Sequence, residues 1–170
     1  MIVTGLDIAA KTGVAQIAEG VVAYAETVEF KKGKEDRFAR WSKYGSVIAS
    51  LCAQSDLVVI ENYGFSFKGS GIPLVEQGAI IRLAIYRQGI PFIEVPPLTL
   101  KKFVSGNGGA KKKDMLLALR ERWKFETNDD NIGDAYGLAM IGVTLLDQRT
   151  PDELAALREK YDTLLTNALR

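Results

Sequence analysis

The chain has 170 residues, of which 47% are hydrophobic and 25% charged, a composition typical of one globular domain. Histidine is absent, which excludes histidine-based acid–base catalysis, serine or cysteine triads that use histidine, and histidine-ligated zinc. The one cysteine, Cys52, cannot form an internal disulfide, as in proteins of a reducing compartment. Any catalysis therefore depends on carboxylates, lysines, hydroxyls or an oxygen-bound metal ion.

The hydropathy pattern predicts a protein that does not enter a membrane. No stretch approaches the roughly 18 uninterrupted apolar residues of a membrane-spanning helix. Met1 leads directly into a mostly apolar stretch, without the charged segment and cleavage site of a secretory leader. We therefore expect a protein that stays in the cytoplasm.

The net charge of +1 conceals an uneven distribution along the chain. Residues 31–43 contain six basic residues against two acidic ones, and residues 98–114 contain five lysines against one aspartate. Residues 125–170 are acidic, with nine acids against four bases. The basic stretches are either ordinary solvated faces or parts of one surface that faces phosphates.

The first part of the chain has the pattern of strands. Three short stretches rich in β-branched residues, at 2–8, 13–19 and 21–30, predict an antiparallel meander. Apolar residues three and four apart then predict an amphipathic helix over 35–53. A continuous apolar run over 56–63 predicts an internal, parallel strand that is buried on both faces.

The rest of the chain has mostly the pattern of helices. A helix over 74–88 and a strand over 92–95 complete a right-handed crossover unit. A short helix over 99–104, a glycine-rich loop over 105–109 and helices over 111–123, 131–146 and about 151–169 follow. We therefore expect a single domain over residues 1–170, of α/β class, with a mixed five-stranded sheet flanked by helices and an additional C-terminal helix.

Two acidic residues stand at the carboxyl ends of apolar strands, Asp7 and Glu61. A buried carboxylate is unfavourable unless a cation, hydrogen bonds or solvent reach it. A salt bridge or a turn position explains one such acid. Two on neighbouring strands point to a ligand site, because ligands of open α/β sheets bind at the carboxyl ends of the strands.

A second group of acids, Asp129, Asp130 and Asp134, begins the helix predicted over 131–146. Acids at a helix N-terminus also act as ordinary caps. Together with the strand-end acids they form a set of oxygen donors without nitrogen or sulfur, which favours Mg²⁺ or Mn²⁺ over zinc. Two such ions about 4 Å apart promote phosphodiester cleavage, and lysines beside the glycine-rich loop could hold the phosphate.

Four motifs occur in a fixed order. They are GLDI with KTGVA at residues 5–8 and 11–15, VVIE at 58–61, Lys101 with GNGGAKK at 106–112, and DAYGLA at 134–139. In order and spacing they resemble the RuvC family of Holliday junction resolvases, over roughly residues 1–146. The resemblance implies an RNase H-like fold, a homodimer, and paired symmetric nicking of four-way DNA junctions with Mg²⁺, for which Mn²⁺ substitutes, and without a nucleotide cofactor.

The resemblance also implies roles for individual residues. Asp7, Glu61 and Asp134 fall on the family's metal-binding acids, and Lys101 and Lys112 on its functional lysines. The family's remaining acid lies three residues before the last one, where this chain has Asn131 instead. Asp130, four residues from Asp134 on the same helix face, is our preferred fourth ligand, and the neutral oxygen of Asn131 is the alternative.

An aromatic residue after the second strand-end acid contacts bases in the family. This chain offers Tyr63, Phe65 and Phe67, among which we favour Phe65, with core packing as the alternative for each. We expect the basic stretches to contact DNA phosphates. Their predicted DNA-binding residues are Lys101, Lys102, Lys111, Lys112, Lys113, Arg37 and Arg40.

Several other protein classes share parts of this pattern. Actin-like ATPases and sugar kinases begin with a similar Gly-x-Asp strand, but they need two lobes and more than about 300 residues. Three alternatives stay open: a broader nuclease for forks and flaps, a YqgF-type RNA nuclease, and a junction-binding protein that has lost catalysis. The short, divergent pattern looks like phage-encoded members, so we expect a bacterial or phage-infected bacterial cell.

Overall fold

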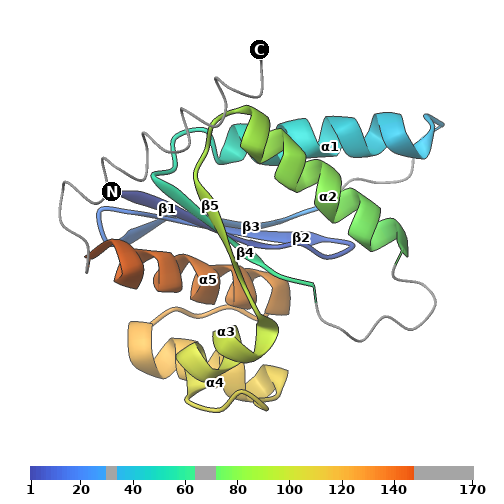
Figure 1. Ribbon diagram of the computed structural model, residues 1–170. Coiled ribbons are helices and arrows are strands. Elements are labelled where there is room, and N and C mark those ends of the chain that lie inside the picture. The colour runs from blue at the N-terminus through green and yellow to red at the C-terminus, as the bar shows by residue number, and fades with distance from the viewer. Residues whose placement is uncertain (30–33, 64–71, 148–170) are drawn as a thin grey trace.

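A mixed five-stranded sheet forms the centre of the computed structural model, which describes residues 1–29, 34–63 and 72–147 (Figure 1). Strands β1, β2 and β3 pair antiparallel, and β4 and β5 extend the sheet parallel to β1. The order across the sheet is β3-β2-β1-β4-β5. The predicted meander and parallel strands are confirmed. The strands are β1 (Ile2–Asp7), β2 (Thr12–Ala18), β3 (Val21–Val28), β4 (Leu57–Glu61) and β5 (Phe92–Val95).

The described residues also contain the predicted helices that precede residue 148, and their ends lie close to the expected positions. α1 begins after Asp36, because the Asp36 side chain accepts hydrogen bonds from the amides of Phe38 and Ala39 at 2.8 and 3.1 Å. None of these helices has the length and apolar character needed to cross a membrane. The helices are α1 (Arg37–Leu51), α2 (Ile72–Arg87), α3 (Pro97–Ser105), α4 (Lys112–Trp123) and α5 (Asp130–Asp147).

The predicted helix over about 151–169 lies outside the described residues, as do residues 30–33 and 64–71. A single domain over the whole of residues 1–170 therefore stays a prediction.

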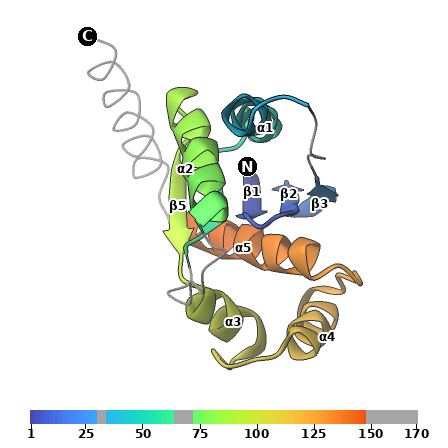
Figure 2. The same cartoon turned by 90° about the vertical axis from the view of Figure 1, so that its right-hand side faces the viewer.

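The sheet separates two helical layers. α1 and α2 cover one face, and α5 covers the other, with α3 and α4 on the far side of α5 (Figure 2). Side chains of β4 alternate between the two cores, with Leu57 and Val59 packing on the α5 side and Val58 and Ile60 on the α1 and α2 side. β4 is therefore buried on both faces, as its continuous apolar run predicts.

Two glycines allow α5 to lie directly on the backbone of β1 and β2. A Cβ atom at Gly5 would overlap the carbonyl oxygen of Ala135, and one at Gly13 would overlap that of Asn131. Any side chain at either position would therefore push α5 away from the sheet. This close approach brings the first turns of α5 next to the carboxyl end of β1.

Candidate active site

Asp7 and Glu61 end neighbouring parallel strands. Leu6 of β1 pairs with Ile60 of β4, so the next residue of each strand lies beside the other. Side chains alternate along a strand, and Asp7 and Glu61 therefore fall on the face that α5 covers, as Gly5 and Val59 do. The structure thus brings together the two strand-end acids, and Asp7 is only 7% exposed.

Asp134 joins them from α5. Burial raises the pKa of Asp134 to about 6, and repulsion by Asp130 adds to the effect, while the positive charges of Lys101 and Lys112 lower it. The negative charge of Asp134 in turn raises the pKa of both Asp7 and Glu61. The three predicted metal-binding acids therefore form one electrostatic group.

The carboxyl groups of Asp7 and Glu61 are joined by a hydrogen bond. Burial, followed by repulsion from Glu61 and Asp134, raises the pKa of Asp7 to about 8. Burial and the charge of Asp134 also raise the pKa of Glu61, although the hydrogen bond from Asp7 and the charge of Lys101 oppose this shift. Two carboxyl groups can share a hydrogen bond only while one of them is protonated, which agrees with the raised pKa values of both.

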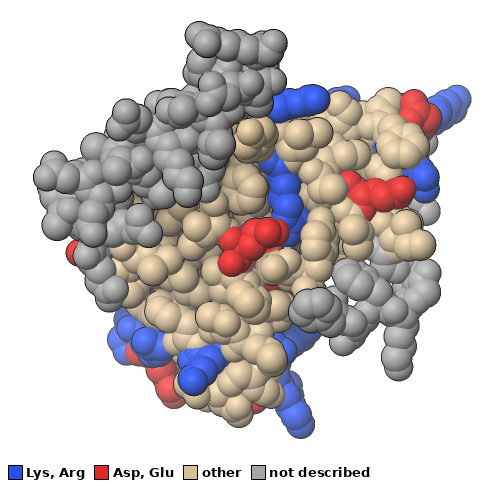
Figure 3. Space-filling view, in the orientation of Figure 1, with Lys and Arg blue, Asp and Glu red and all other residues tan. Residues whose placement is uncertain are grey.

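Two of the five predicted lysines reach the acids. Lys112, at the start of α4, donates a hydrogen bond to Asp130, and this contact raises the pKa of Lys112. Lys101, half-buried on α3, lowers the pKa of both Glu61 and Asp134. The remaining three are exposed around the same glycine-rich loop, and Figure 3 shows basic side chains over the end of the molecule formed by α3 and α4. They are Lys102, Lys111 and Lys113.

The acids at the start of α5 make different contacts. Asp129 caps the helix, because its carboxylate accepts hydrogen bonds from the Asn131 amide at 2.9 Å and from Thr27 Oγ1 at 2.7 Å. Burial raises the pKa of Asp129, but these bonds outweigh it and lower the pKa overall. The side chain of Asn131 also bonds to Asp129, whereas Asp130 interacts with Lys112 and Asp134. Asp130, rather than Asn131, thus faces the carboxylate group.

The predicted arginines lie away from these lysines. Arg37 and Arg40 are on α1, which covers the opposite face of the sheet from α3 and α4 (Figure 2). The Arg37 guanidinium lies 4.8 Å from the centre of the Phe38 ring, and its Nη1 lies 3.5 Å from Glu76 Oε2. Arg37 and Arg40 therefore lie on the opposite side of the sheet from the lysines of α3 and α4.

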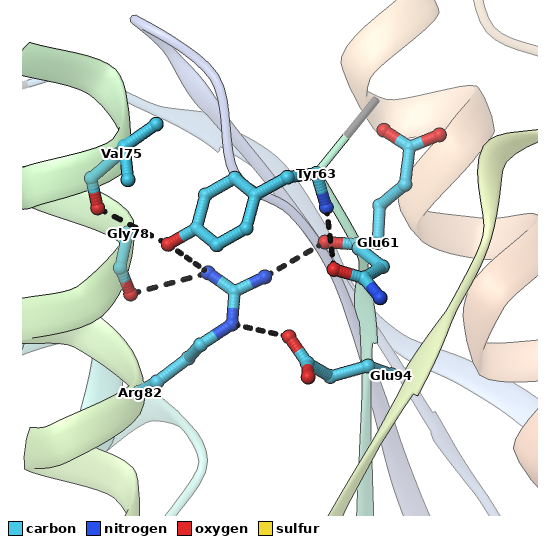
Figure 4. Close-up of polar contacts among 7 residues, drawn as sticks. Glu61, Tyr63, Val75, Gly78, Arg82 and Glu94 are labelled. Atoms are coloured by element: carbon cyan, nitrogen blue, oxygen red, sulfur yellow. Dashed lines mark hydrogen bonds and ion pairs between the residues drawn. The ribbon is translucent and has the colours of Figure 1, made fainter. Parts of the chain in front are cut away.

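Tyr63 is held against α2. Its hydroxyl donates a hydrogen bond to the carbonyl oxygen of Val75 at 3.1 Å, and the guanidinium carbon of Arg82 lies 4.4 Å from its ring centre (Figure 4). Phe65 and Phe67 lie outside the described residues. The choice of a base-contacting aromatic residue stays a prediction.

The sequence interpretation missed Arg82, which links α2 to the end of β4. Its Nη2 donates to the carbonyl oxygen of Glu61 at 3.0 Å, and its Nε donates to Glu94 Oε1 at 2.6 Å (Figure 4). An arginine within a largely apolar helix was the available signal, since a buried charge needs partners.

The donor set of the site suits a hard divalent cation. The side chains of Asp7, Glu61 and Asp134 offer only carboxylate oxygens, the ligands that Mg²⁺ and Mn²⁺ prefer. Burial and repulsion from neighbouring acids raise the pKa of each. In this arrangement, the described part of the chain contains no group of three or more acidic, cysteine or histidine side chains placed to hold a metal ion. Asp7 and Glu61 instead share a hydrogen bond with each other, and Asp130 accepts one from Lys112.

Comparison with known proteins identifies relatives. No protein-family model matches the chain. The crossover junction endodeoxyribonuclease RuvC of a Prochlorococcus marinus strain, SARG, is 32% identical over 89 residues, which are 51% of this chain and 57% of that protein. RuvC of Synechococcus sp. WH7803 is 28% identical over 89 residues, which are 51% of this chain and 58% of that protein. The chain thus matches somewhat more than half the length of these relatives.

Solved structures share the fold more extensively. Thermus thermophilus RuvC superposes with a TM-score of 0.72 at 19% identity, covering 86% of this chain and 96% of that one. The same protein in complex with a Holliday junction substrate gives a TM-score of 0.72 at 16% identity, covering 86% and 94%. The fold is therefore the predicted RNase H-like one. The chain is thus similar in sequence to RuvC proteins over about half of its length and shares their fold over most of it, in agreement with the resemblance of its motifs.

Proposed function

We propose that this chain is a Mg²⁺-dependent endonuclease that resolves four-way DNA junctions by paired symmetric nicks. The observation that carries the proposal is the convergence of Asp7, Glu61 and Asp134, with Lys101 and Lys112 beside them. The relatives named above support the substrate class, since their name is crossover junction endodeoxyribonuclease and one solved RuvC holds a Holliday junction substrate.

Each group of side chains has a proposed role. The divalent cations would be held by Asp7, Glu61, Asp134 and Asp130. Their positive charge would stabilise the negative charge that develops during phosphodiester hydrolysis. Lys112 exchanges its contact with Asp130 for an oxygen of the scissile phosphate, where a positive charge stabilises the transition state.

The exposed lysines around the glycine-rich loop grip the DNA backbone away from the cut. Lys102, Lys111 and Lys113 contribute affinity without sequence preference, so binding weakens as salt increases. Paired nicks need two sites related by a two-fold axis, and we propose a homodimer that acts in the cytoplasm.

Cleavage of an end-labelled synthetic four-way junction tests the proposal. The protein is assayed in Mg²⁺ and in Mn²⁺ beside a replication fork, a flap, a linear duplex and an RNA hairpin. Asp7→Asn serves as the matched variant, because it removes a proposed metal ligand and leaves the basic surface intact. We expect symmetric paired nicks in the junction, no cutting by Asp7→Asn, and similar junction affinity for both proteins.

The other outcomes identify the alternatives. Equal cutting of forks and flaps would indicate a broader branched-DNA nuclease, and preferential cutting of RNA would indicate a YqgF-type enzyme. Binding of the junction without cutting in either metal would indicate a junction-binding protein. Cutting by Asp7→Asn at the parent rate would remove Asp7 from the metal site.

A further inference from the structure

Arg82 is a nearly buried charge in the middle of α2. Its side chain is only 12% exposed, and all three guanidinium nitrogens donate hydrogen bonds. Nε bonds to Glu94 on β5, Nη2 to the carbonyl oxygen of Glu61, and Nη1 to the Tyr63 hydroxyl at 3.1 Å and the Gly78 carbonyl at 3.2 Å. A planar guanidinium supports such a set of directed bonds, which an ammonium group cannot form at once.

These bonds hold the chain where β4 ends. Pairing between β1 and β4 runs as far as Leu6 and Ile60, so the Glu61 carbonyl lies just beyond it and accepts from Arg82 instead. Two residues later, Arg82 lies against the ring and hydroxyl of Tyr63 (Figure 4). The backbone on both sides of Asn62 is therefore tied to α2, in addition to the β5 side, where Glu61 pairs with Val95 and the Asn62 amide donates to the Val95 carbonyl at 2.9 Å.

We propose that Arg82 is a positioning residue that holds Glu61 in the carboxylate site through its backbone, with Glu94 and Tyr63 as supporting partners. Its side chain contacts the main chain of Glu61 on the α2 side of the sheet, while the Glu61 carboxylate meets Asp7 on the α5 side. The inference rests on the proposed function only in taking Glu61 as a metal ligand. Mutation of groups that orient a metal ligand typically lowers metal affinity or activity by roughly 10- to 100-fold.

Substitution of Gly78 by alanine would displace the side-chain ends of Arg82 and Tyr63 without removing any hydrogen-bond donor. A Cβ atom at Gly78 would lie 2.7 Å from Tyr63 Oη and 2.9 Å from Arg82 Nη1, so both side-chain ends must shift. Alanine is also the better helix former, so Gly78→Ala keeps α2 stable. Arg82→Lys is the second variant, because it keeps the charge but loses the planar set of donors.

A matched control is available on the same helix. Arg87 is exposed in the last turn of α2, so Arg87→Gln removes an arginine charge without touching the end of β4. Four quantities are measured for each protein: Mn²⁺ affinity by calorimetry, kcat for four-way junction cleavage, junction affinity without divalent ions, and Tm.

We expect Gly78→Ala and Arg82→Lys to weaken Mn²⁺ binding and lower kcat by roughly tenfold. Junction affinity should match that of the parent. Arg87→Gln should behave as the parent in Mn²⁺ affinity and kcat. Parental Mn²⁺ affinity in both Gly78→Ala and Arg82→Lys, or an effect limited to Tm, would overturn the positioning role.

The same data separate this inference from the proposed function. If the parent binds Mn²⁺ but cuts no branched DNA, the proposed function fails, while the Mn²⁺ comparison still decides the role of Arg82. If the parent binds no Mn²⁺, both proposals fail.

Discussion

The carboxyl groups of Asp7 and Glu61 share a hydrogen bond, which two neighbouring carboxyl groups can form only while one of them is protonated. Burial and repulsion from Glu61 and Asp134 raise the pKa of Asp7 to about 8. Without a divalent cation the site therefore keeps a proton at neutral pH. A bound cation would replace that proton and relieve the repulsion.

The raised pKa of Asp7 predicts how stability depends on pH. The unfolded chain releases this proton near the ordinary pKa of 3.8 and the folded chain only near 8, so the free energy of unfolding falls as the pH rises between these values. Asp7→Asn should raise the free energy of unfolding near pH 8 by at least about 1.4 kcal/mol, the equivalent of one pKa unit, in the presence of EDTA.

Urea unfolding of the parent and Asp7→Asn at about pH 5 and pH 8 measures this effect. Asp147→Asn, which changes an exposed acid at the other end of α5, is the control and should leave the dependence unchanged. Equal pH slopes for the parent and Asp7→Asn would contradict the prediction. Added Mg²⁺ should stabilise the parent near pH 8 and Asp7→Asn much less.

Lys112 and Lys113 are adjacent exposed lysines with different neighbours. Lys112 contacts Asp130 beside the carboxylates, so Lys112→Ala should lower kcat by about 100-fold with little change in junction affinity. Lys113→Ala should keep kcat and weaken the salt dependence of junction binding. Single-turnover cleavage and binding titrations at several salt concentrations distinguish the two, and an equal loss of kcat in both variants would make Lys112 part of the general basic surface.

Asp130 and Asn131 can be separated by substitution. Asp130→Asn should raise the Mg²⁺ concentration needed for half-maximal cleavage, and it should lower the pKa of Asp134 by removing a neighbouring negative charge. Asn131→Ala should leave the Mg²⁺ dependence unchanged and reduce stability by about 1 kcal/mol, since it removes a hydrogen bond to the cap residue Asp129. Cleavage rates measured over a range of Mg²⁺ concentrations distinguish the two residues. A changed Mg²⁺ dependence in Asn131→Ala, with none in Asp130→Asn, would assign the fourth ligand to Asn131.

Gly5 should tolerate no side chain. Gly5→Ala forces a Cβ atom onto the Ala135 carbonyl, which should lower the free energy of unfolding by about 3 kcal/mol or more. Gly109→Ala is the control, because its Cβ would meet only Asn107 Oδ1 at 3.5 Å, and it should change stability by less than about 0.5 kcal/mol. Urea denaturation measures both, and equal stabilities would show that α5 can move away from β1 at little cost.

Much of this fold is predictable from short-range patterns. The apolar run of β4 and the spacing of apolar residues in α1 identify their elements, and the acids that end β1 and β4 stand out against apolar neighbours. Asp129 as a helix cap was also foreseen, as an alternative reading of the acids that begin α5.

Contacts between distant elements could not be predicted in the same way. Nothing in the spacing of Arg82, Glu94 and Glu61 indicates that one guanidinium joins them, because the relation depends on how α2 packs beside β4 and β5. The role of Gly5 similarly depends on the distance between α5 and the sheet. Tertiary packing, rather than local preference, determines both.

The carboxylates of the site come from positions 7, 61 and 134, so α5 is the last described element that the site needs. During synthesis on the ribosome, β1 and β4 emerge well before Asp134 does. A nascent chain, or a fragment that ends before residue 130, therefore carries Asp7 and Glu61 without the third acid. The three acids therefore come together only once α5 has docked on Gly5 and Gly13, after β1 to β5 have all been synthesised.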